Sequence, residues 1–398
     1  MIAALMAGIV VVSPGGPVSN LRAAVALARP GDTITVRAGH YREGGTVVVD
    51  RPLVIRGEGG PVFEAGERTF LLVTANGVTI EGLVITGVRP SSTDDRAAIK
   101  LDQVTGCVVR GNQIRRSFFG IHGSKVTGCV IEDNRIEGPG ATEQMAGNAI
   151  HFWSSAGITV QRNQVEGHRD GIYLEFVRSS MLRDNASRGN RRYGLHFMFS
   201  DSCRYERNHF TSNGAGVAVM YSKHVTMTGN EFARNEGQAA FGLLLKDISD
   251  GEISDNRFTS NTTGLYLEGS NRLAVHGNRF EANGWALRLL ANATDNQFDG
   301  NVFLSNAFDV TTNSRSATSH FRGNYWDQYR GFDLDHDGFG DVPHRPVRLF
   351  SLVVEQSEPA LILLRSLFVD LLDQAERVLP ILTPEALVDP TPLMARPR

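Results

Sequence analysis

An asparagine recurs along this chain at nearly constant spacing, and this repeat limits the possible folds more than any other feature. The separations between successive copies are 22, 29, 22, 23, 22, 26, 22, 23 and 23 residues. The repeated residues are Asn112, Asn134, Asn163, Asn185, Asn208, Asn230, Asn256, Asn278, Asn301 and Asn324. A period near 22 with two insertions is typical of a solenoid, in which each repeat buries its apolar side only against its neighbours.

The interior of one repeat indicates which solenoid forms. Between Asn256 and Asn278, apolar residues come in pairs that alternate with polar ones, such as Leu265 with Leu267. This is the pattern of short, half-buried strands, and the glycines and asparagines between the pairs predict turns. No space remains for a helix. We therefore predict an all-β fold, a right-handed parallel β-helix with three sides and coils of about 22–23 residues. We expect one interior stack of Phe210, Phe232, Phe258, Phe280 and Phe303.

The repeated asparagines have a structural explanation. Equivalent positions in successive coils stack about 4.8 Å apart, so asparagine amides can hydrogen-bond along the axis while their turns adopt left-handed backbone angles. A second asparagine follows five residues later in several coils, as in Asn256 and Asn261. We expect both columns to stabilise the solenoid rather than to act in chemistry.

The composition argues against one class of partner. The net charge is −3 and only four lysines occur, so no basic stripe is present and nucleic-acid binding is not expected.

The three cysteines occupy equivalent positions in their repeats. Cys107, Cys129 and Cys203 each precede a repeat asparagine by five residues. They are therefore expected in one inward-facing column of core residues. A disulfide between Cys107 and Cys129 is possible at the spacing of adjacent coils.

The ends of the chain differ from the repeat and divide it into segments. Residues 1–45 predict an N-terminal strand and a helix over Ser19–Ala28 that caps the solenoid, and residues 46–330 form the β-helix itself. Met1–Val12 resembles part of a secretory signal, although Val10–Val12 also fits a strand. Residues 331–356 form an acidic loop and connector.

Residues 357–398 predict a C-terminal helix and tail. A helix over Ala360–Val378 would begin with Ser357 as its cap and Pro359 in its first turn. Its apolar stretch is too short and too charged to span a membrane. It either packs on the last coil or docks on a membrane-bound partner, and its excess of apolar residues favours docking.

The acidic loop resembles the front of a calcium-binding loop. Its carboxylates come from Asp333, Asp335, Asp337 and Asp341, and Gly338 occupies the position of the sharp turn. Alternate residues point at one centre, which suits a hard cation such as calcium or magnesium. The glutamate that would complete an EF-hand is absent. A plain acidic turn is the alternative.

A second group of metal-ligand side chains is expected on the outer face of the solenoid. In strands that follow the second asparagine, one outward column contains His122, His151, Tyr173 and His196, and its neighbour contains Met198 and Met220. Imidazole and thioether ligands together suit a soft ion such as Cu(I). The residues predicted to bind copper are His196, Met198 and Met220, and His151 and His122 extend the column as a second station or a transfer path. Isolated surface histidines and packing methionines are the alternative.

At these residues the sequence resembles the NosD family of nitrous-oxide reductase maturation proteins. The resemblance rests on residues 192–201 (RYGLHFMFSD), 216–222 (GVAVMYS) and 323–327 (GNYWD), together with the acidic loop and the C-terminal helix. It implies a periplasmic, non-enzymatic metallochaperone that associates with the membrane through its partner. It also implies three partners: the membrane and ATPase subunits of an ABC-type transporter, a copper chaperone lipoprotein, and apo nitrous-oxide reductase. The cargo implied is copper, with sulfur as a further possibility.

The competing interpretation is an enzyme, because β-helices often host polysaccharide lyases, hydrolases and epimerases that act on uronate polymers. Such enzymes need paired carboxylates, or a carboxylate beside a basic residue, in a long groove. His168, Arg169, Asp170 and Glu175 form only a partial set. A purely structural spacer is a third possibility, but it would not explain the histidine and methionine columns.

Overall fold

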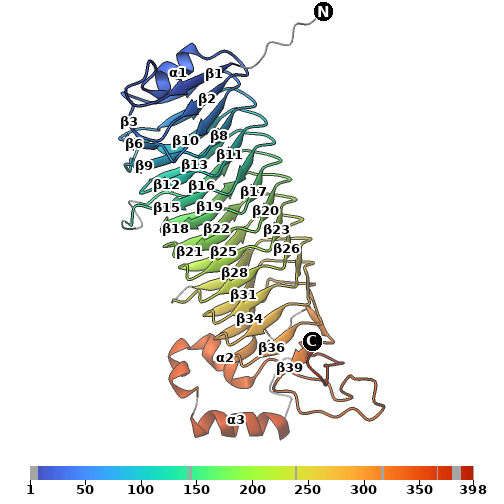
Figure 1. The fold of residues 1–398 in the computed structure, drawn as a ribbon. Coiled ribbons are helices and arrows are strands. Elements are labelled where there is room, and N and C mark those ends of the chain that lie inside the picture. The colour runs from blue at the N-terminus through green and yellow to red at the C-terminus, as the bar shows by residue number, and fades with distance from the viewer. Residues whose placement is uncertain are drawn as a thin grey trace, which may run out of the picture. The chain divides into compact units, whose positions relative to one another are not determined.

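The computed structural model describes residues 8–140, 142, 146–237, 240–314, 318–364, 366–378 and 387–397. Two compact units divide the chain, Met1–Arg204 and Tyr205–Arg398. Each unit is a parallel β-solenoid with three sheets, and successive coils supply successive strands of each sheet (Figure 1). The boundary between the units falls inside β23 (Arg204–Glu206). The predicted parallel β-helix is confirmed.

The three sheets of the first unit consist of short strands. Sheet 1 contains β1 (Ile9–Val12), β2 (Thr33–Val36), β5 (Val54–Gly57), β8 (Thr79–Glu81), β11 (Val108–Arg110), β14 (Val130–Glu132), β17 (Thr159–Gln161) and β20 (Met181–Arg183). Sheet 2 contains β4 (Val47–Val49), β7 (Leu71–Val73), β10 (Ala97–Asp102), β13 (Phe119–Ser124), β16 (Ile150–Trp153), β19 (Asp170–Glu175) and β22 (Tyr193–Met198). Sheet 3 contains β3 (His40–Arg42), β6 (Val62–Gly66), β9 (Val84–Val88), β12 (Gln113–Arg115), β15 (Arg135–Glu137), β18 (Gln164–Glu166) and β21 (Ala186–Arg188).

The second unit repeats this arrangement. Its first sheet contains β26 (Thr226–Thr228), β29 (Glu252–Ser254), β32 (Ala274–His276), β35 (Gln297–Asp299) and β38 (His320–Arg322). The next contains β25 (Ala215–Met220), β28 (Phe241–Lys246), β31 (Thr263–Glu268), β34 (Trp285–Leu289) and β37 (Phe308–Thr312). The third contains β24 (His209–Thr211), β27 (Glu231–Ala233), β30 (Arg257–Thr259), β33 (Arg279–Glu281), β36 (Val302–Leu304) and β39 (Tyr325–Trp326).

The core of the second unit contains the expected phenylalanine stack. The five rings of Phe210, Phe232, Phe258, Phe280 and Phe303 follow one another with centroid separations of 5.6, 4.7, 4.7 and 5.0 Å. Trp326 extends the stack at 4.1 Å from Phe303, and all six side chains are buried. Stacked identical rings fix the register of the coils because a one-residue slip would move every ring to the outer face.

Buried asparagines form hydrogen-bonded ladders in both units. The backbone N–H and the side-chain Nδ2 of Asn112 both donate to Oδ1 of Asn134, each at 3.0 Å. In the second unit the corresponding ladder ends on the buried carboxylate of Asp389, which accepts bonds from Asn324 N at 2.9 Å and Asn324 Nδ2 at 3.0 Å. The last amides of the column are therefore capped by a charge rather than left unpaired.

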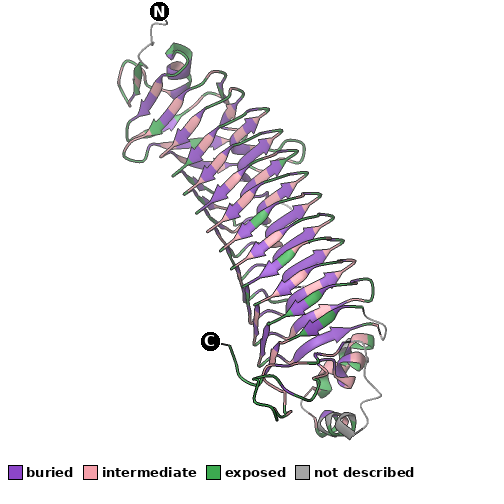
Figure 2. Ribbon diagram, turned by 90° about the vertical axis from the view of Figure 1, so that its right-hand side faces the viewer, coloured by how far each residue is buried: buried purple, intermediate pink, exposed green. Residues whose placement is uncertain are grey.

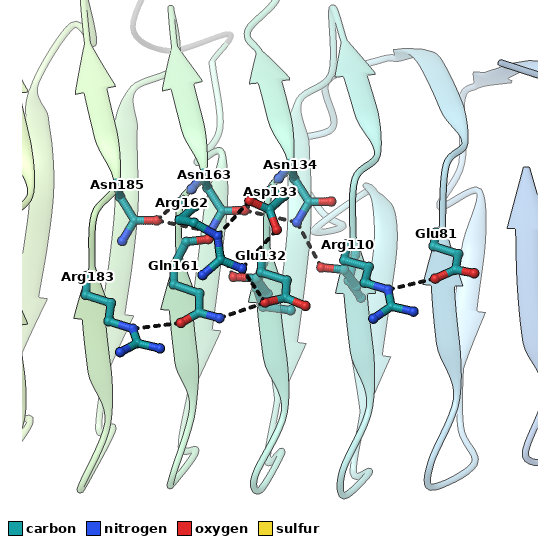
Figure 3. Close-up of polar contacts among 12 residues, drawn as sticks. Glu81, Arg110, Glu132, Asp133, Asn134, Gln161, Arg162, Asn163, Arg183 and Asn185 are labelled. Atoms are coloured by element: carbon teal, nitrogen blue, oxygen red, sulfur yellow. Dashed lines mark hydrogen bonds and ion pairs between the residues drawn. The ribbon is translucent and has the colours of Figure 1, made fainter. Parts of the chain in front are cut away.

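A further side-chain ladder lies on sheet 1 of the first unit (Figure 3). Arg183 donates to Gln161 at 2.7 Å, and Gln161 donates in turn to Glu132 at 2.6 Å. Arg162 also pairs with Glu132 and with Asp133. These contacts join adjacent coils at the surface of the solenoid.

The N-terminal segment agrees with the prediction. Helix α1 (Leu21–Leu27) begins at Asn20, whose side chain accepts the backbone N–H of Ala23 at 2.8 Å, and its residues Leu21, Ala24 and Val25 are buried. The expected strand at Val10–Val12 is β1. Met1 to Ala7, the main part of the possible secretory signal, lie outside the described residues.

The predicted continuous helix over Ala360–Val378 is wrong. The structure instead has α2 (Leu349–Gln356), a 3₁₀-helix η2 (Glu358–Leu363) and α3 (Leu367–Val378). The Ser357 side chain makes no capping bond. The chain turns between η2 and α3, and Val369 of α3 packs with Phe350 and Val354 of α2 against Phe308. Tertiary packing thus overrides the local helical pattern.

Within the described part of the chain, no helix has the length and apolarity needed to cross a membrane.

Candidate metal-binding site

Sheet 2 of the first unit aligns the predicted histidines in one column. Strand pairing places His122 beside His151, His151 beside Tyr173, and Tyr173 beside His196. The centroids of neighbouring rings are 4.9, 4.7 and 4.6 Å apart in that order. The column therefore forms as predicted from the two-residue period of the strands.

The expectation that this column is open to solvent is wrong. His122 is 5% exposed and His196 only 3%, although neighbouring core residues such as Ile121 and Phe197 occupy the opposite side of their strands. Other aromatic rings cover the column, since Phe119 lies 5.7 Å from His122 and Tyr193 lies 4.8 Å from His196. Figure 2 shows that the strands on the side that faces the viewer are mostly buried or half-buried. His122 and His196 thus occupy a shielded layer outside the sheet, and His151 and Tyr173 between them are half-buried.

The ring nitrogens of these histidines lack hydrogen-bond partners. Among the described residues, nothing bonds to Nδ1 of His122 or to either nitrogen of His151 and His196. Buried polar atoms are almost always paired, so these unpaired imidazole nitrogens are candidates for binding a ligand that is not part of the chain. Burial lowers the pKa of His122 to about 4, and burial also lowers the pKa of His151 well below its usual value. Both rings are therefore neutral at pH 7 and their lone pairs are available to a metal ion.

A buried charge lies beside this column. Asp170 is fully buried, and neither of its oxygens has a hydrogen-bond partner within the described ranges. Its Oδ2 lies 3.7 Å from Nδ1 of His196 and 3.7 Å from Nε of Arg169. Arg169 is thus an ion-pair partner of Asp170, but a buried carboxylate without hydrogen bonds is costly, so this arrangement suits additional positive charge.

The structure places the predicted methionines in two different units. Met198 ends β22 and is half-buried, and its sulfur lies 3.7 Å from the hydroxyl of Tyr173. Met220 ends β25 in the second unit. In the first unit, Tyr173 stands between His151 and His196, so the predicted ligands separate into a His122–His151 pair and a His196–Met198 pair.

Asp170 and Tyr173 are functional candidates that the metal-ligand pattern alone did not identify. The sequence placed Asp170 among the four residues of an incomplete polysaccharide-cleaving site. It placed Tyr173 in the histidine column without assigning it a role. His168 and Asp170 are fully buried, while Arg169 and Glu175 are half-buried. A polymeric sugar cannot reach the two buried groups, so this set does not form a polysaccharide-cleaving site.

The acidic loop brings three of its four predicted ligands together. Carboxylate oxygens of Asp333, Asp335 and Asp337 lie within 4.8 Å of one another. Asp341 instead accepts the backbone N–H of Leu334 at 2.7 Å and closes the loop. Gly338 has a φ of 91°, which explains the glycine at the turn.

The three cysteines are buried free thiols, as expected for core residues. The backbone N–H of Cys107 approaches the sulfur of Cys129 at 3.3 Å, so the two adjacent coils bring these residues together without a disulfide. They face the interior of the solenoid and stay apart from the histidine column on its outer side.

Comparison with known proteins gives matches to a family that is described as copper-binding. Residues 132–331 match a family described as "Periplasmic copper-binding protein (NosD)". A protein of Pseudomonas aeruginosa named "Probable ABC transporter binding protein NosD" is 31% identical, covering 94% of this chain and 93% of its own length. The chain belongs to the NosD family. A NosD of Stutzerimonas stutzeri with the same printed name is 27% identical over 90% of this chain and 86% of its own length.

The family assignment confirms the resemblance and agrees with the expected periplasmic location. Both NosD relatives are named as transporter-binding proteins rather than as enzymes.

Solved structures show similarity of fold alone. The A-module of the mannuronan C-5 epimerase AlgE6 of Azotobacter vinelandii has a TM-score of 0.65 at 14% identity, covering 78% of this chain and 96% of that one. A family 28 exopolygalacturonase of Yersinia enterocolitica has a TM-score of 0.58 at 12% identity, covering 79% and 77%.

Proposed function

We propose that this NosD protein is a non-enzymatic copper carrier for the maturation of nitrous-oxide reductase. It accepts Cu(I) from a copper chaperone and, together with an ABC-type transporter, passes the ion to the apo-reductase. The copper-binding description of the family and the transporter-binding names of its relatives support this proposal. Copper is the cargo in this scheme, and sulfur is a further candidate.

The observation that carries the proposal is the set of unpaired imidazole nitrogens in the covered column. His122, His151 and His196 offer imidazole nitrogens, and Met198 offers a thioether. This mixture suits Cu(I) better than it suits calcium or magnesium, which prefer oxygen. Asp170 contributes a negative charge that a bound cation would offset.

Tyr173 divides the column into two stations. Its ring stacks 4.7 Å from His151 on one side and 4.6 Å from His196 on the other, so the two histidines lie two coils apart. The first station consists of His122 and His151. The second consists of His196 and Met198. The other predicted ligand, Met220, belongs to the second unit. A carrier must release its ion, and sites with few soft ligands favour release over a closed thiolate site.

Anaerobic titration with Cu(I) against a chromophoric chelator tests this assignment. We expect about two ions per chain in the wild type. His122→Ala with His151→Ala should remove one ion, and His196→Ala with Met198→Ala should remove the other. The double variant Cys107→Ser with Cys129→Ser is the control and should keep both ions. Unchanged stoichiometry and affinity in both histidine variants would contradict the assignment.

Transporter docking is proposed for the C-terminal helix α3. Val369 and the neighbouring Leu372 face the cluster of Phe308 and Phe350, whereas Leu367 and Leu371 are 76% and 57% exposed. An exposed apolar patch of this kind is typical of a protein contact surface. The patch therefore suits the membrane subunits of the transporter, which would hold the protein at the membrane.

A hard cation, calcium or magnesium, is proposed for the carboxylates of Asp333, Asp335 and Asp337, with Asp341 closing the loop. Mutual repulsion among three close carboxylates falls when a divalent ion binds. We expect EDTA to lower the melting temperature of the wild type and calcium to restore it. Asp335→Asn should bind calcium more weakly. An unchanged melting temperature in EDTA, with no calcium binding by calorimetry, would show that the segment is only a turn.

A further inference from the structure

The outward column of sheet 2 continues on the N-terminal side of His122. Strand pairing places Leu72 of β7 beside Lys100 of β10, and Lys100 beside His122 of β13. A groove of about 560 Å³ lies over these earlier coils. Leu72 and Lys100 line it, together with the loop segment Thr93–Arg96 and the side chain of Asp102. At roughly 30 Å³ per water molecule, the groove can admit an ion with its hydration shell.

Asp95 connects this groove to the buried column. Its side chain is 58% exposed, whereas that of His122 is 6% exposed, and Oδ2 of Asp95 lies 3.7 Å from Nε2 of His122. The other ring nitrogen of His122 has no hydrogen-bond partner among the residues described. A carboxylate that belongs to the open groove thus reaches the first imidazole of the covered column.

The charges of the groove distinguish Asp95 from its neighbours. Glu67 is paired with Arg89 at 2.9 Å, and Asp94 lies 4.0 Å from Arg96. Within the described part of the chain, Asp95 and Asp102 have no lysine or arginine at ion-pair distance. Lys100 and Arg68 supply opposing positive charge in the groove, and Lys100 lies beside His122 in the strand pairing. Unneutralised carboxylates at the mouth of a cleft raise the local concentration of cations.

We infer that this groove is the entrance through which Cu(I) reaches the histidine column, and that the negative charge of Asp95 attracts the ion before it binds to His122. The inference rests on the proposed copper-carrying function. It gives the column a direction, because the His122–His151 station must then load before the His196–Met198 station. Lys100 occupies the preceding position in the column and directs the cation toward the Asp95 side.

Stopped-flow loading with Cu(I), presented under anaerobic conditions as its cationic acetonitrile complex, tests the entrance. Asp95→Asn should slow loading of both stations by about tenfold at low ionic strength, and the difference should shrink as salt screens the carboxylate. Leu72→Trp fills the groove without altering a ligand. It should slow loading and release together, so that the dissociation constant stays within about twofold of the wild-type value. Glu64→Gln, which removes one exposed charge from β6 on sheet 3, is the matched control and should load at the wild-type rate.

Two failures can be told apart. If the wild-type protein binds no Cu(I), the proposed function fails and the entrance fails with it. If the wild type binds Cu(I) normally but Asp95→Asn or Leu72→Trp loads at the wild-type rate, the entrance is overturned while the stations stand.

Discussion

At the scale of single residues, buried and half-buried imidazoles make the stability of this fold depend on pH. Burial lowers the pKa of His122, His168 and His344 to about 4. Because these folded-state values lie below the ordinary value near 6.5, each ring contributes stability that is complete near neutral pH. That stability is lost as the pH falls, because the unfolded chain then binds protons that the folded chain excludes.

His168 offers a test of this linkage, since it is fully buried and lies outside the proposed copper ligands. Between pH 7.5 and pH 5, a histidine whose pKa falls from 6.5 to about 4 on folding should lose about 2 kcal/mol of stability. His168→Gln cannot titrate in this range. Guanidinium unfolding at the two pH values should therefore show a loss smaller by about that amount in the variant. Equal pH dependence in both proteins would contradict the buried, neutral assignment of His168.

At the scale of the elements, ladders between coils stabilise the solenoid. Each strand has only two to six residues, so its stability depends on the coils on either side. The phenylalanine stack supplies apolar contact inside the second unit, and the asparagine ladders satisfy the amides of the turns. At the end of one ladder, the Asp389 carboxylate accepts hydrogen bonds from Asn324 and so satisfies the last amides of the column.

Phe258 is the central ring of the stack and lies 4.7 Å from each neighbour. Phe258→Ala should lower the free energy of unfolding by about 3–5 kcal/mol because it removes apolar contact and leaves a cavity between two coils. Phe258→Leu keeps most of the volume and should cost less than about 2 kcal/mol. Chemical denaturation measures both. A loss below 1 kcal/mol for the alanine variant would contradict the role of the stack.

The positions of residues within the repeat were easier to predict from the sequence than the burial of their side chains. The asparagine period and the two-residue alternation were enough to place His122, His151 and His196 in one column. Their burial was not predictable, because it depends on how Phe119 and Tyr193 fold over the outer face of sheet 2. The helix over Ala360–Val378 failed for a similar reason, since contact with α2 and β37 decides where the chain turns.

At the scale of the whole molecule, the proposed copper site and the proposed transporter contact belong to different segments. The covered histidines, Asp170 and the groove lie in the first unit, and α3 with its exposed leucines lies in the second. The tail that follows α3 carries Asp389, so deleting the C-terminal segment would damage the solenoid as well as the docking surface. Point substitutions on α3 separate these two effects.

Leu367→Glu with Leu371→Glu should abolish co-purification with the transporter, because charged side chains cannot be buried in an apolar contact without a partner. The solenoid should keep its wild-type melting temperature, since both leucines are exposed. Gln374→Glu on the same helix is the control and should leave co-purification intact. Normal co-purification of the double variant would place the transporter contact elsewhere.

The central claim is that imidazole and thioether groups of this chain bind copper directly. X-ray absorption at the copper edge of the Cu(I)-loaded protein tests it. We predict imidazole scattering that weakens in His122→Ala with His151→Ala, and a sulfur shell that disappears in Met198→Leu with Met220→Leu. A sulfur shell that survives both methionine substitutions, or copper coordinated without imidazole, would contradict the account.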